Sequence, residues 1–293
     1  MNKRLRLVLQ KKGRLSQESI NLLQRCGLTF RIKENALVTH VENFPIDLLF
    51  VRDDDIPTLV FDGLCDGGIV GENVLFEAAL HSPHKQYRTV LPLGHCYCRL
   101  AIAVPESFDY RGPGSLEGKR IATSYPYLLA QYLNERKIRA ERLVLSGSVE
   151  VAPRMGMADA ICDLVSSGQT LEDNKLIEVE TVLKSQATFI QSTHAITAEQ
   201  QALFDMLARR IKAVQQASER KYIVFHAPTM ALEKICNHLP GAESPTIVPL
   251  PATPDKVAVH VVSSERIFWN TLETIQSLGA SSILVLPIEK MLE

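Results

Sequence analysis

Short apolar runs alternate along this chain with longer segments whose apolar residues recur at helical spacing. The short runs predict strands at residues 5–9, 67–70 and 120–123. The longer segments predict helices after them, for example at 127–136. Strands that alternate with helices in this way favour an α/β fold.

Capping residues mark the ends of the first two predicted helices. Ser16 is placed as the N-cap of the first helix, and Gly27 as its C-terminal stop. The pair Asp54-Asp55 is expected to cap a second helix, which carries Pro57 in its first turn and ends at Gly63.

A second lobe is predicted to repeat the plan of the first. Gly156-Met157-Ala158-Asp159 repeats the pattern of Gly63-Leu64-Cys65-Asp66, and each precedes an apolar strand that ends in a polar loop. Coincidence is the alternative. Two such lobes would leave a cleft between them, and ligands in open α/β sheets bind outside the carboxyl ends of the strands. Four loops would then surround one cleft, at 10–15, 71–73, 124–126 and 163–170.

The last quarter of the chain indicates a separate module. A long helical pattern at 199–219 is expected to pack on the first lobe and to connect it to this module. Beyond it the predicted order is βαββαβ, which is the ferredoxin-like plan. The four strands are expected at 222–225, 246–250, 257–262 and 283–286, and the two helices at 230–239 and 265–278.

Composition narrows the class of protein without identifying it. A chain of 293 residues exceeds what one core usually serves, so two or three domains are expected. The formal net charge of −1 provides no basic field for nucleic acid, and no apolar run is long enough for a signal peptide or a membrane span. The cysteines show no zinc spacing, and Cys96 and Cys98 are expected as buried thiols on one face of a strand. A reducing, cytoplasmic compartment is therefore expected.

The stretch from Asp163 to Thr170 carries the clearest chemistry. It follows an apolar strand and precedes a helical start, so its backbone N–H groups and helix dipole suit a phosphate. Gly168 would let the backbone approach the phosphate oxygens, and hydroxyls from Ser166, Ser167 and Thr170 would add donors. Asp163 lies further back and suits the hydroxyls of a ribose. A simple Ser/Gly turn capped by Asp163 is the alternative.

This pattern, Asp-x-x-x-Ser-Ser-Gly-x-Thr, resembles the motif by which phosphoribosyltransferases hold phosphoribosyl pyrophosphate, although Cys162 stands where many of them carry a second acidic residue. Further segments make nearly the whole chain look like long-form ATP phosphoribosyltransferase. They are Ser148–Arg154, Ala158–Leu171, Val51–Pro57, Gly71–Val74 and Ser281–Met291.

The resemblance implies an enzyme that opens histidine biosynthesis. It would transfer phosphoribose from phosphoribosyl pyrophosphate to N1 of the adenine of ATP, with Mg²⁺ held mainly by substrate and histidine as feedback inhibitor. The implied fold has two periplasmic-binding-protein-like lobes and a ferredoxin-like regulatory domain, and the implied assemblies are a dimer and a hexamer. The implied boundaries are 1–97 for lobe I, 98–184 for lobe II, 185–220 for the return and connector helix, and 221–293 for the regulatory domain.

Charged residues near the predicted cleft are the candidates for the reaction. Lys11, Arg14 and Arg52 would bind pyrophosphate or ATP phosphates, and Lys11, Arg52 and Asp163 are the catalytic candidates; solvated surface charge is the alternative for the cations. Ribose or a metal-bound water would be contacted by Glu150, whereas Asp159 is expected either at the phosphoribosyl pyrophosphate loop or as its brace. The remaining candidates are Gln169 in that loop and Glu72, Asn73 and Arg99 for ATP or pyrophosphate.

Two of these assignments leave an alternative open. Arg99 lies in an apolar strand, where an unpaired charge would be costly, so its partner is either substrate or an internal carboxylate. In the C-terminal module the resemblance places the histidine contacts near His226, Thr246 and Ser282, which otherwise are ordinary strand ends.

Two rival functions are considered. One is a non-catalytic two-lobed solute or effector-binding protein with an added sensor domain, which the Asp163–Thr170 loop disfavours. The other is a phosphoribosyltransferase with another acceptor, such as a free base, which the C-terminal module and the breadth of the resemblance disfavour.

Overall fold

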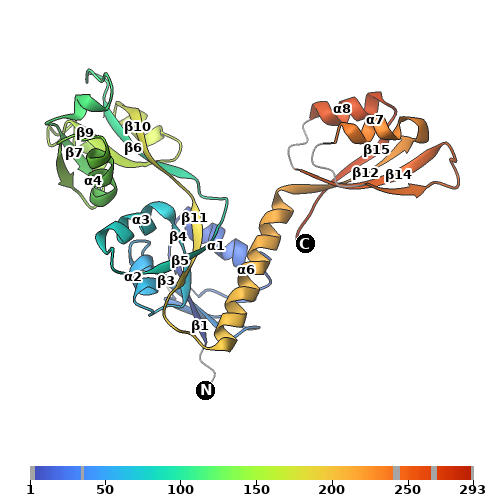
Figure 1. The fold of residues 1–293 in the computed structure, drawn as a ribbon, viewed down its shortest axis with the longest axis horizontal. Coiled ribbons are helices and arrows are strands. Elements are labelled where there is room, and N and C mark those ends of the chain that lie inside the picture. The colour runs from blue at the N-terminus through green and yellow to red at the C-terminus, as the bar shows by residue number, and fades with distance from the viewer. Residues whose placement is uncertain (1–3, 34–35, 240–244, 265–268, 292–293) are drawn as a thin grey trace. The chain divides into compact units, whose positions relative to one another are not determined.

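The structure is a computed structural model that describes residues 4–33, 36–239, 245–264 and 269–291. It divides into two compact units, Met1–Phe204 and Asp205–Glu293. The first unit contains two α/β lobes, and the second contains a smaller α/β domain (Figure 1).

Lobe I is built on a six-stranded sheet with the order β2-β3-β1-β4-β11-β5. β1 runs parallel to β3 and β4, so these three strands end at the same edge of the sheet. The strands are β1 (Leu5–Gln10), β2 (Val38–His40), β3 (Ile46–Val51), β4 (Gly67–Gly71), β5 (Tyr87–Pro92) and β11 (Ala187–Ser192). The helices are α1 (Arg14–Arg25), α2 (Asp55–Phe61) and α3 (Glu72–His81).

Lobe II is built on a five-stranded sheet with the order β10-β6-β9-β7-β8. β7 runs parallel to β8 and β9, whereas β6 and β10 run antiparallel beside them. The strands are β6 (Cys98–Pro105), β7 (Arg120–Thr123), β8 (Glu141–Val144), β9 (Ala160–Val165) and β10 (Leu176–Ser185). The helices are α4 (Pro126–Glu135) and α5 (Gln169–Asp173), with short 3₁₀ turns at Pro113–Leu116 and Val149–Val151.

The chain passes between the two lobes twice. It leaves lobe I after β5 and enters lobe II at β6, and it returns where β10 ends at Ser185 and β11 begins at Ala187. β11 then pairs with both β4 and β5, so the lobe I sheet is completed by a strand from near the end of the unit's sequence. The two crossing segments form the hinge between the lobes.

The repeated sequence pattern corresponds to a repeated structural device. The Asp66 carboxylate accepts a hydrogen bond from the backbone N–H of Arg6 at 2.7 Å, and the Asp159 carboxylate accepts one from the backbone N–H of Arg120 at 2.8 Å. Each aspartate also donates its own N–H to the carbonyl of the same arginine. In each lobe, therefore, the aspartate before one strand fastens it to the neighbouring strand, and the similarity is not coincidence.

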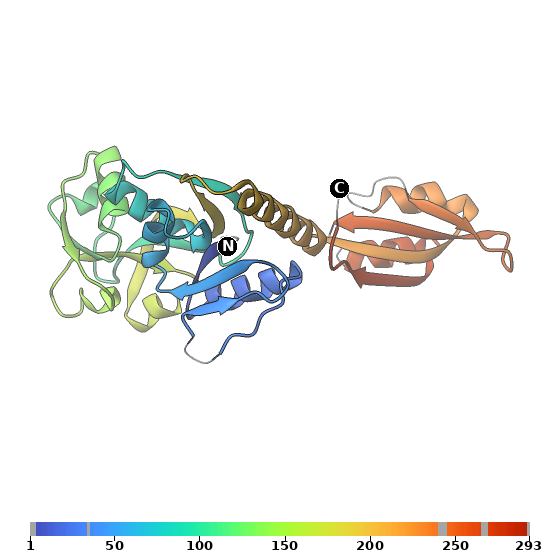
Figure 2. The same ribbon diagram turned by 90° about the horizontal axis from the view of Figure 1, so that it is seen from below.

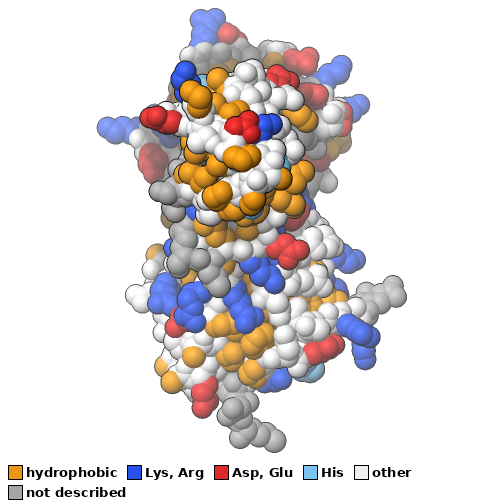
Figure 3. Space-filling model, turned by 90° about the vertical axis from the view of Figure 1, so that its right-hand side faces the viewer, with side chains coloured by type: hydrophobic (Ala, Val, Ile, Leu, Met, Phe, Trp, Pro, Cys, Tyr) orange, Lys and Arg blue, Asp and Glu red, His pale blue; other side chains and the backbone are white. Residues whose placement is uncertain are grey.

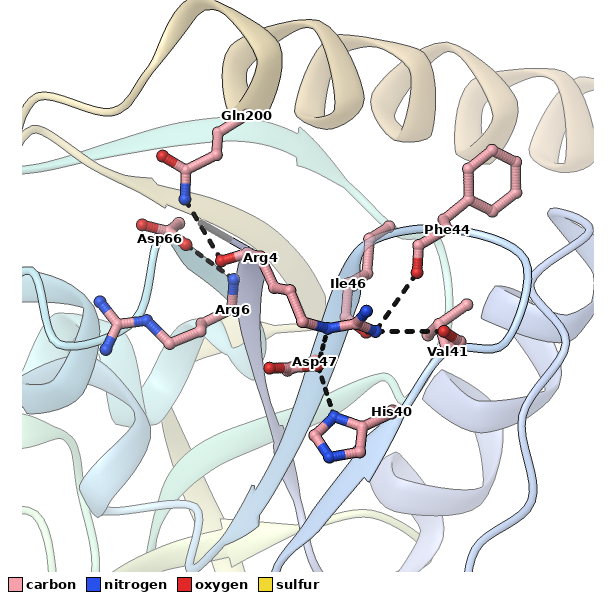
Figure 4. Close-up of polar contacts among 9 residues, drawn as sticks. All are labelled: Arg4, Arg6, His40, Val41, Phe44, Ile46, Asp47, Asp66 and Gln200. Carbon is pink, nitrogen blue, oxygen red and sulfur yellow. Dashed lines mark hydrogen bonds and ion pairs between the residues drawn. The ribbon is translucent and has the colours of Figure 1, made fainter. Parts of the chain in front are cut away.

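A cluster of polar contacts near Asp66 fastens the amino ends of the lobe I strands, opposite their carboxyl ends (Figure 4). The Arg4 guanidinium donates to the Asp47 carboxylate at 2.5 Å and to the carbonyls of Val41 and Ile46 at 3.1 and 2.8 Å. The His40 ring lies against the same carboxylate, with 2.7 Å between Nδ1 and Oδ1. The start of β1 is thereby tied to the β2–β3 hairpin.

A single long helix, α6 (Ala198–Ser218), precedes the C-terminal domain (Figure 2). Its first turns belong to the first unit, where the Phe204 ring stacks on Phe189 of β11 with 4.7 Å between centroids. The Gln200 side-chain amide donates to the Arg4 carbonyl at 3.3 Å.

The C-terminal domain confirms the ferredoxin-like prediction. Its antiparallel sheet has the order β13-β14-β12-β15, and both helices lie on one face of the sheet (Figure 1). The elements are β12 (Arg220–Pro228), α7 (Leu232–Asn237), β13 (Thr246–Pro249), β14 (Lys256–Ser264), α8 (Trp269–Ser277) and β15 (Ser281–Pro287). The expected helix start at residue 265 lies outside the described residues.

The domain buries one face of its sheet and leaves apolar side chains on the other. Ile223, Phe225 and Val259 are fully buried in its core. On the other face Val224 pairs with Leu284, which is 58% exposed. Figure 3, which views the domain from its free end, shows hydrophobic side chains gathered on its lower part.

Three local predictions were wrong. α1 begins at Arg14 after Gly13, whose φ is +97°, so Ser16 is buried inside the helix and does not cap it. Asp54 does precede α2, but its side chain makes no capping hydrogen bond. Cys96 has a φ of +54° and lies in the crossing segment before β6; it and Cys98 are half-buried and do not share a strand face.

Candidate functional site

The carboxyl ends of the three parallel lobe I strands bring several candidates to one edge. Lys11 follows β1, and its N–H donates to the Val51 carbonyl at 2.7 Å, beside Arg52 at the end of β3. Glu72 follows β4 as the first residue of α3. The edge therefore carries two cations and a carboxylate on neighbouring strands, as the positions after strand ends predicted.

The acidic residues after Arg52 shape the charge of this edge. Burial raises the pKa of the Asp54 carboxyl, and the charges of Asp53 and Asp55 raise it further, while Arg52 lowers it. Arg14, the first residue of α1, faces the crossing segment, where its charge acts on the half-buried thiols of Cys96 and Cys98. Arg14 therefore lies toward the hinge.

Asp163 lies within β9 and not after it, because the strand continues to Val165. Its carboxylate accepts hydrogen bonds from the N–H of Leu164 at 2.8 Å and from the Ser124 hydroxyl at 3.4 Å. Burial raises its pKa, and the charge of Glu150 adds to the effect, while the two hydrogen bonds oppose it. A partly buried carboxylate that has a raised pKa and accepts few hydrogen bonds is typical of a ligand-binding position.

The turn after β9 presents open backbone. Gly168 has a φ of +90°, and a Cβ added there would meet nothing within 4 Å, so a ligand has free access to this backbone. The Gln169 N–H points to the Ser167 hydroxyl at 3.4 Å. Thr170 follows in α5, which has only five residues. The predicted loop thus exists, although its helix is a single turn.

The partner of Arg99 is an internal carboxylate. Arg99 donates to both oxygens of Glu178 at 2.6 and 2.5 Å, and its third contact, at 3.4 Å, is the carbonyl of Ser166 in the turn. This bidentate pair settles the open alternative, since the guanidinium is held within the protein. Arg99 therefore contacts the turn through the Ser166 carbonyl. It also lines a cavity of about 360 Å³, together with Glu72, Tyr97, Cys98, Ser166, Lys184, Ser185 and Gln186.

The side chain of Asn73 is hydrogen-bonded within the protein. It is buried, its Oδ1 accepts from the Ser185 hydroxyl at 2.9 Å, and its Nδ2 donates to the Tyr125 hydroxyl at 2.9 Å. These bonds engage both polar atoms of the Asn73 side chain, and its contact with ATP stays a prediction. Glu72 is also engaged, since it accepts the N–H of Gln186 at 3.3 Å.

Tyr125 is the point where the two lobes meet. Burial raises the pKa of its phenol, and the negative charges of Asp163 in lobe II and of Asp53 and Asp54 in lobe I add to the effect. The Tyr125 hydroxyl also accepts a hydrogen bond from the Asn73 side chain of lobe I at 2.9 Å, so it lies at a contact between the two lobes. The strand-end loops of lobe I and lobe II face a common region, as the two-lobed prediction required.

Asp159 is not part of this group. It lies at the other end of β9, where it fastens Arg120, so it does not brace the turn directly. Glu150 lies in the 3₁₀ turn Val149–Val151, near enough to Asp163 to raise its pKa.

Sequence reasoning did not single out Tyr125, Ser124 or Ser185. A tyrosine after a strand and a serine at a strand end carry no motif, so only their neighbours in space reveal them. The loop that contains Ser124 and Tyr125 was nevertheless expected at the cleft.

In the C-terminal domain the three expected effector contacts do not converge. Thr246 lies on the edge strand β13, Ser282 on the opposite edge strand β15, and His226 on β12 between them. Three strand spacings separate the edges, which is roughly 14 Å. Ser282, with a φ of +52°, lines a cavity of about 630 Å³ together with Trp269 of α8.

Together the two sheets of the first unit define a two-lobed α/β protein, to which a ferredoxin-like domain is added. The family model "HisG: ATP phosphoribosyltransferase" matches residues 52–213, and "HisG, C-terminal domain" matches residues 217–290. The chain belongs to the ATP phosphoribosyltransferase family in its long form, and it is a transferase of the first step of histidine biosynthesis.

Solved structures resemble the chain over about seven tenths of its length. The ATP phosphoribosyl transferase (HisG:HisZ) complex from Thermotoga maritima contains a chain that is 25% identical, with a TM-score of 0.58 over 71% of this chain and 98% of that chain. A histidine kinase sensor domain with similarity to periplasmic binding proteins matches at 12% identity, with a TM-score of 0.47 over 72% of this chain and 89% of that chain.

Two features are absent from the described residues, a membrane-spanning helix and a cluster of metal ligands. No helix there is long and apolar enough to cross a membrane. Within the same residues no three His, Cys, Asp or Glu side chains gather as a metal site.

Proposed function

We propose that this enzyme transfers the phosphoribosyl group of phosphoribosyl pyrophosphate to N1 of the adenine of ATP, with release of pyrophosphate. The observation that carries the proposal is the position of Asp163 before the open turn at Gly168, beside the loop at Ser124 and Tyr125 that contacts lobe I through Asn73. A carboxylate and an open turn on one lobe, with cations on the edge of the other, suit a phosphorylated sugar.

Asp163 is proposed to bind the two ribose hydroxyls. Burial and the charge of Glu150 raise the pKa of Asp163, so the ionised form gains from any added donor. Two ribose hydroxyls would supply such donors. The 5-phosphate would then lie on the backbone N–H groups of residues 166–170, with hydroxyls of Ser166, Ser167 and Thr170 beside it and Arg99 behind the turn.

Lys11, Arg14 and Arg52 are proposed to neutralise the leaving pyrophosphate and the ATP phosphates. As the bond to pyrophosphate breaks, the ribose acquires positive charge and the leaving group negative charge. Lys11 and Arg52 lie on neighbouring strand ends, so they can contact one pyrophosphate group together. The protein then contributes alignment and charge, and needs no covalent intermediate.

Mg²⁺ is proposed as the cofactor. The oxygen donors of Asp163 and Glu150 are of the kind that Mg²⁺ prefers, but too few carboxylates gather among the described residues for an all-protein site. Pyrophosphate oxygens would complete the ligand set, so the ion would bind with the substrate and stabilise the charge of the leaving group.

An absorbance assay for the product tests the reaction. Product should form from ATP and phosphoribosyl pyrophosphate with Mg²⁺ and should be absent after chelation. A free base supplied in place of ATP is the control for acceptor choice. Turnover with adenine but not with ATP would replace the proposed acceptor.

Residues 221–293 are proposed to bind histidine as a feedback inhibitor. The ferredoxin-like domain has its own core, so it can respond to a ligand without forming the reaction site. Because Thr246 and Ser282 lie on opposite sheet edges, one site that used both would need two copies of the domain. Initial rates with added histidine test this: Thr246→Ala and Ser282→Trp should each resist inhibition and retain turnover without histidine.

A homo-oligomer is proposed, with an active form built from dimers and a hexamer as the inhibited form. The open face of the C-terminal sheet carries half-exposed apolar side chains, including Val248, Leu284 and Leu286, which water disfavours. Sedimentation of Leu284→Lys against the parent protein tests whether this face joins copies. An unchanged assembly would place the contact elsewhere.

A further inference from the structure

One face of helix α3 contacts the start of helix α4 at three successive turns. The face consists of Asn73, Glu77 and His81, which are spaced four residues apart and therefore point the same way. We call these three residues the α3 stripe. α3 belongs to lobe I and α4 to lobe II, so each contact joins the lobes within the first unit.

The contacts of Glu77 and His81 hold the first turn of α4. The Glu77 carboxylate accepts the N–H groups of Tyr127 and Leu128, each at 2.8 Å, and so caps a helix that has no capping side chain of its own. The His81 ring is hydrogen-bonded to the Tyr127 hydroxyl. These bonds satisfy backbone donors that the helix cannot satisfy internally.

The inner contact reaches the reaction region. Asn73 donates to the Tyr125 hydroxyl at 2.9 Å, and on its other side it exchanges two hydrogen bonds with Ser185, the last residue before the chain returns to lobe I. Asn73 and Ser185 are both buried. The Tyr125 hydroxyl is therefore attached to the hinge itself.

From Tyr125 the connection continues toward Asp163. The Tyr125 N–H donates to the Thr123 hydroxyl at 2.9 Å, and that hydroxyl donates to the carbonyl of Cys162 at 2.7 Å. Cys162 immediately precedes Asp163, and Ser124 lies between the two anchoring residues with its hydroxyl 3.4 Å from the Asp163 carboxylate. A shift of Tyr125 would move the Thr123 hydroxyl, which is bonded to Cys162, and the Ser124 hydroxyl, which is bonded to Asp163.

We propose that Tyr125 is a positioning residue for phosphoribosyl transfer: its hydroxyl, held by Asn73 at the hinge, aligns the Asp163 edge of lobe II with the Lys11 and Arg52 edge of lobe I. The inference rests on the proposed function, because alignment matters only if the reacting groups bind to different lobes. Transfer depends steeply on such alignment, since small displacements of reacting atoms remove much of the rate.

The test compares Tyr125→Phe with Tyr132→Phe. Both changes remove one phenol oxygen, but the Tyr132 hydroxyl donates to Glu180 at 3.0 Å within lobe II. Tyr125→Phe should lower kcat by about tenfold to a hundredfold, with KM for ATP and phosphoribosyl pyrophosphate changed less than about threefold. Tyr132→Phe should leave kcat within about twofold of the parent.

A double-mutant cycle isolates the bond. If the Asn73–Tyr125 bond carries the effect, Asn73→Ala with Tyr125→Phe should lower kcat no more than the worse single variant. Additive losses would overturn the proposal, as would an unchanged kcat for Tyr125→Phe. A rise in KM for one substrate at constant kcat would instead make Tyr125 a substrate contact. An inactive parent enzyme would reject the proposed reaction before any variant is compared.

Discussion

At the scale of single residues, two aspartates illustrate opposite roles, one just before β9 and one within it. Asp159 and Asp163 lie near the two ends of β9, four residues apart. Asp159 is satisfied by a backbone N–H of the neighbouring strand, whereas the pKa of Asp163 is raised by burial and by the charge of Glu150. Asp159 therefore contributes to the fold, whereas Asp163 is the residue proposed to bind ribose.

Replacement of Asp163 by Asn should separate activity from stability. The loss of charge-assisted hydrogen bonds to ribose, each worth about 1.5–3 kcal/mol, should lower kcat/KM by at least about a hundredfold. The unliganded variant should melt at a higher temperature than the parent at pH 7. A raised folded-state pKa means that ionisation destabilises the fold as pH rises, and Asn removes that ionisation.

The difference in Tm should shrink as the pH falls below the folded-state pKa, where Asp163 is protonated in the parent. Asp159→Asn is the matched control. It should lower Tm because it weakens the brace to Arg120, and it should leave kcat/KM within about threefold. If the two variants exchange these behaviours, the assigned roles are wrong.

At the scale of elements, the turn at Gly168 depends on backbone conformation. Gly168 has a φ of +90° and open space beside it. An added methyl group would meet no neighbour, but this backbone conformation is unfavourable for a residue that has a Cβ. Gly168→Ala should lower the free energy of unfolding by about 1–2 kcal/mol. It should also weaken the thermal stabilisation by phosphoribosyl pyrophosphate.

Gly114 provides the comparison for this experiment, since a Cβ there also meets nothing but its φ is not positive. Gly114→Ala should leave both Tm and ligand stabilisation nearly unchanged. Full stabilisation of Gly168→Ala by phosphoribosyl pyrophosphate would place the phosphate away from this turn.

The Arg4–Asp47 contact at the amino ends of the lobe I strands should give acid sensitivity. Burial raises the pKa of Asp47, but hydrogen bonds from His40 and Arg4 and the charge of Arg4 outweigh it, so the pKa is lowered overall. The stability from this group is present above the unfolded-state pKa and is lost as pH falls through the folded-state value. Asp47→Asn should therefore lower Tm at pH 7 by a few degrees.

As the pH falls through the folded-state pKa of Asp47, the Tm of Asp47→Asn should approach that of the parent protein, whose Asp47 is then losing its charge. A Tm deficit that is independent of pH would show that shape, and not charge, carries the contribution.

Sequence reasoning succeeded where apolar spacing determines structure. The strand at 120–123 and the βαββαβ order follow from side chains that must be buried on one face, and the structure has both. The cap at Ser16 failed because the positive φ of Gly13, invisible to apolar spacing, starts the helix earlier. Asn73 was assigned to ATP because it follows the turn at Gly71, and its hydrogen bonds to Tyr125 and Ser185 could not be foreseen because both partners are distant in sequence.

At the scale of the whole molecule, the C-terminal domain has a hydrophobic core of its own. Its buried cluster draws only on residues between Ile223 and Ala280. Residues 217–293 expressed alone should therefore fold, with a cooperative thermal transition by circular dichroism. Ile235→Ala should abolish or strongly lower that transition, since truncating a buried Ile costs about 2–5 kcal/mol. A non-cooperative transition in the unmutated fragment would show that the domain needs the rest of the chain.

The double crossing between the lobes fixes an order of events during synthesis. Lobe I is not complete until β11 pairs with β4, more than 100 residues away in the chain, whereas every strand of lobe II lies between Cys98 and Ser185. As the chain leaves the ribosome, lobe II can therefore close while β4 and β5 still lack the strand that joins them. The second half of the unit is free to mature first, and the amino-terminal half must wait for it.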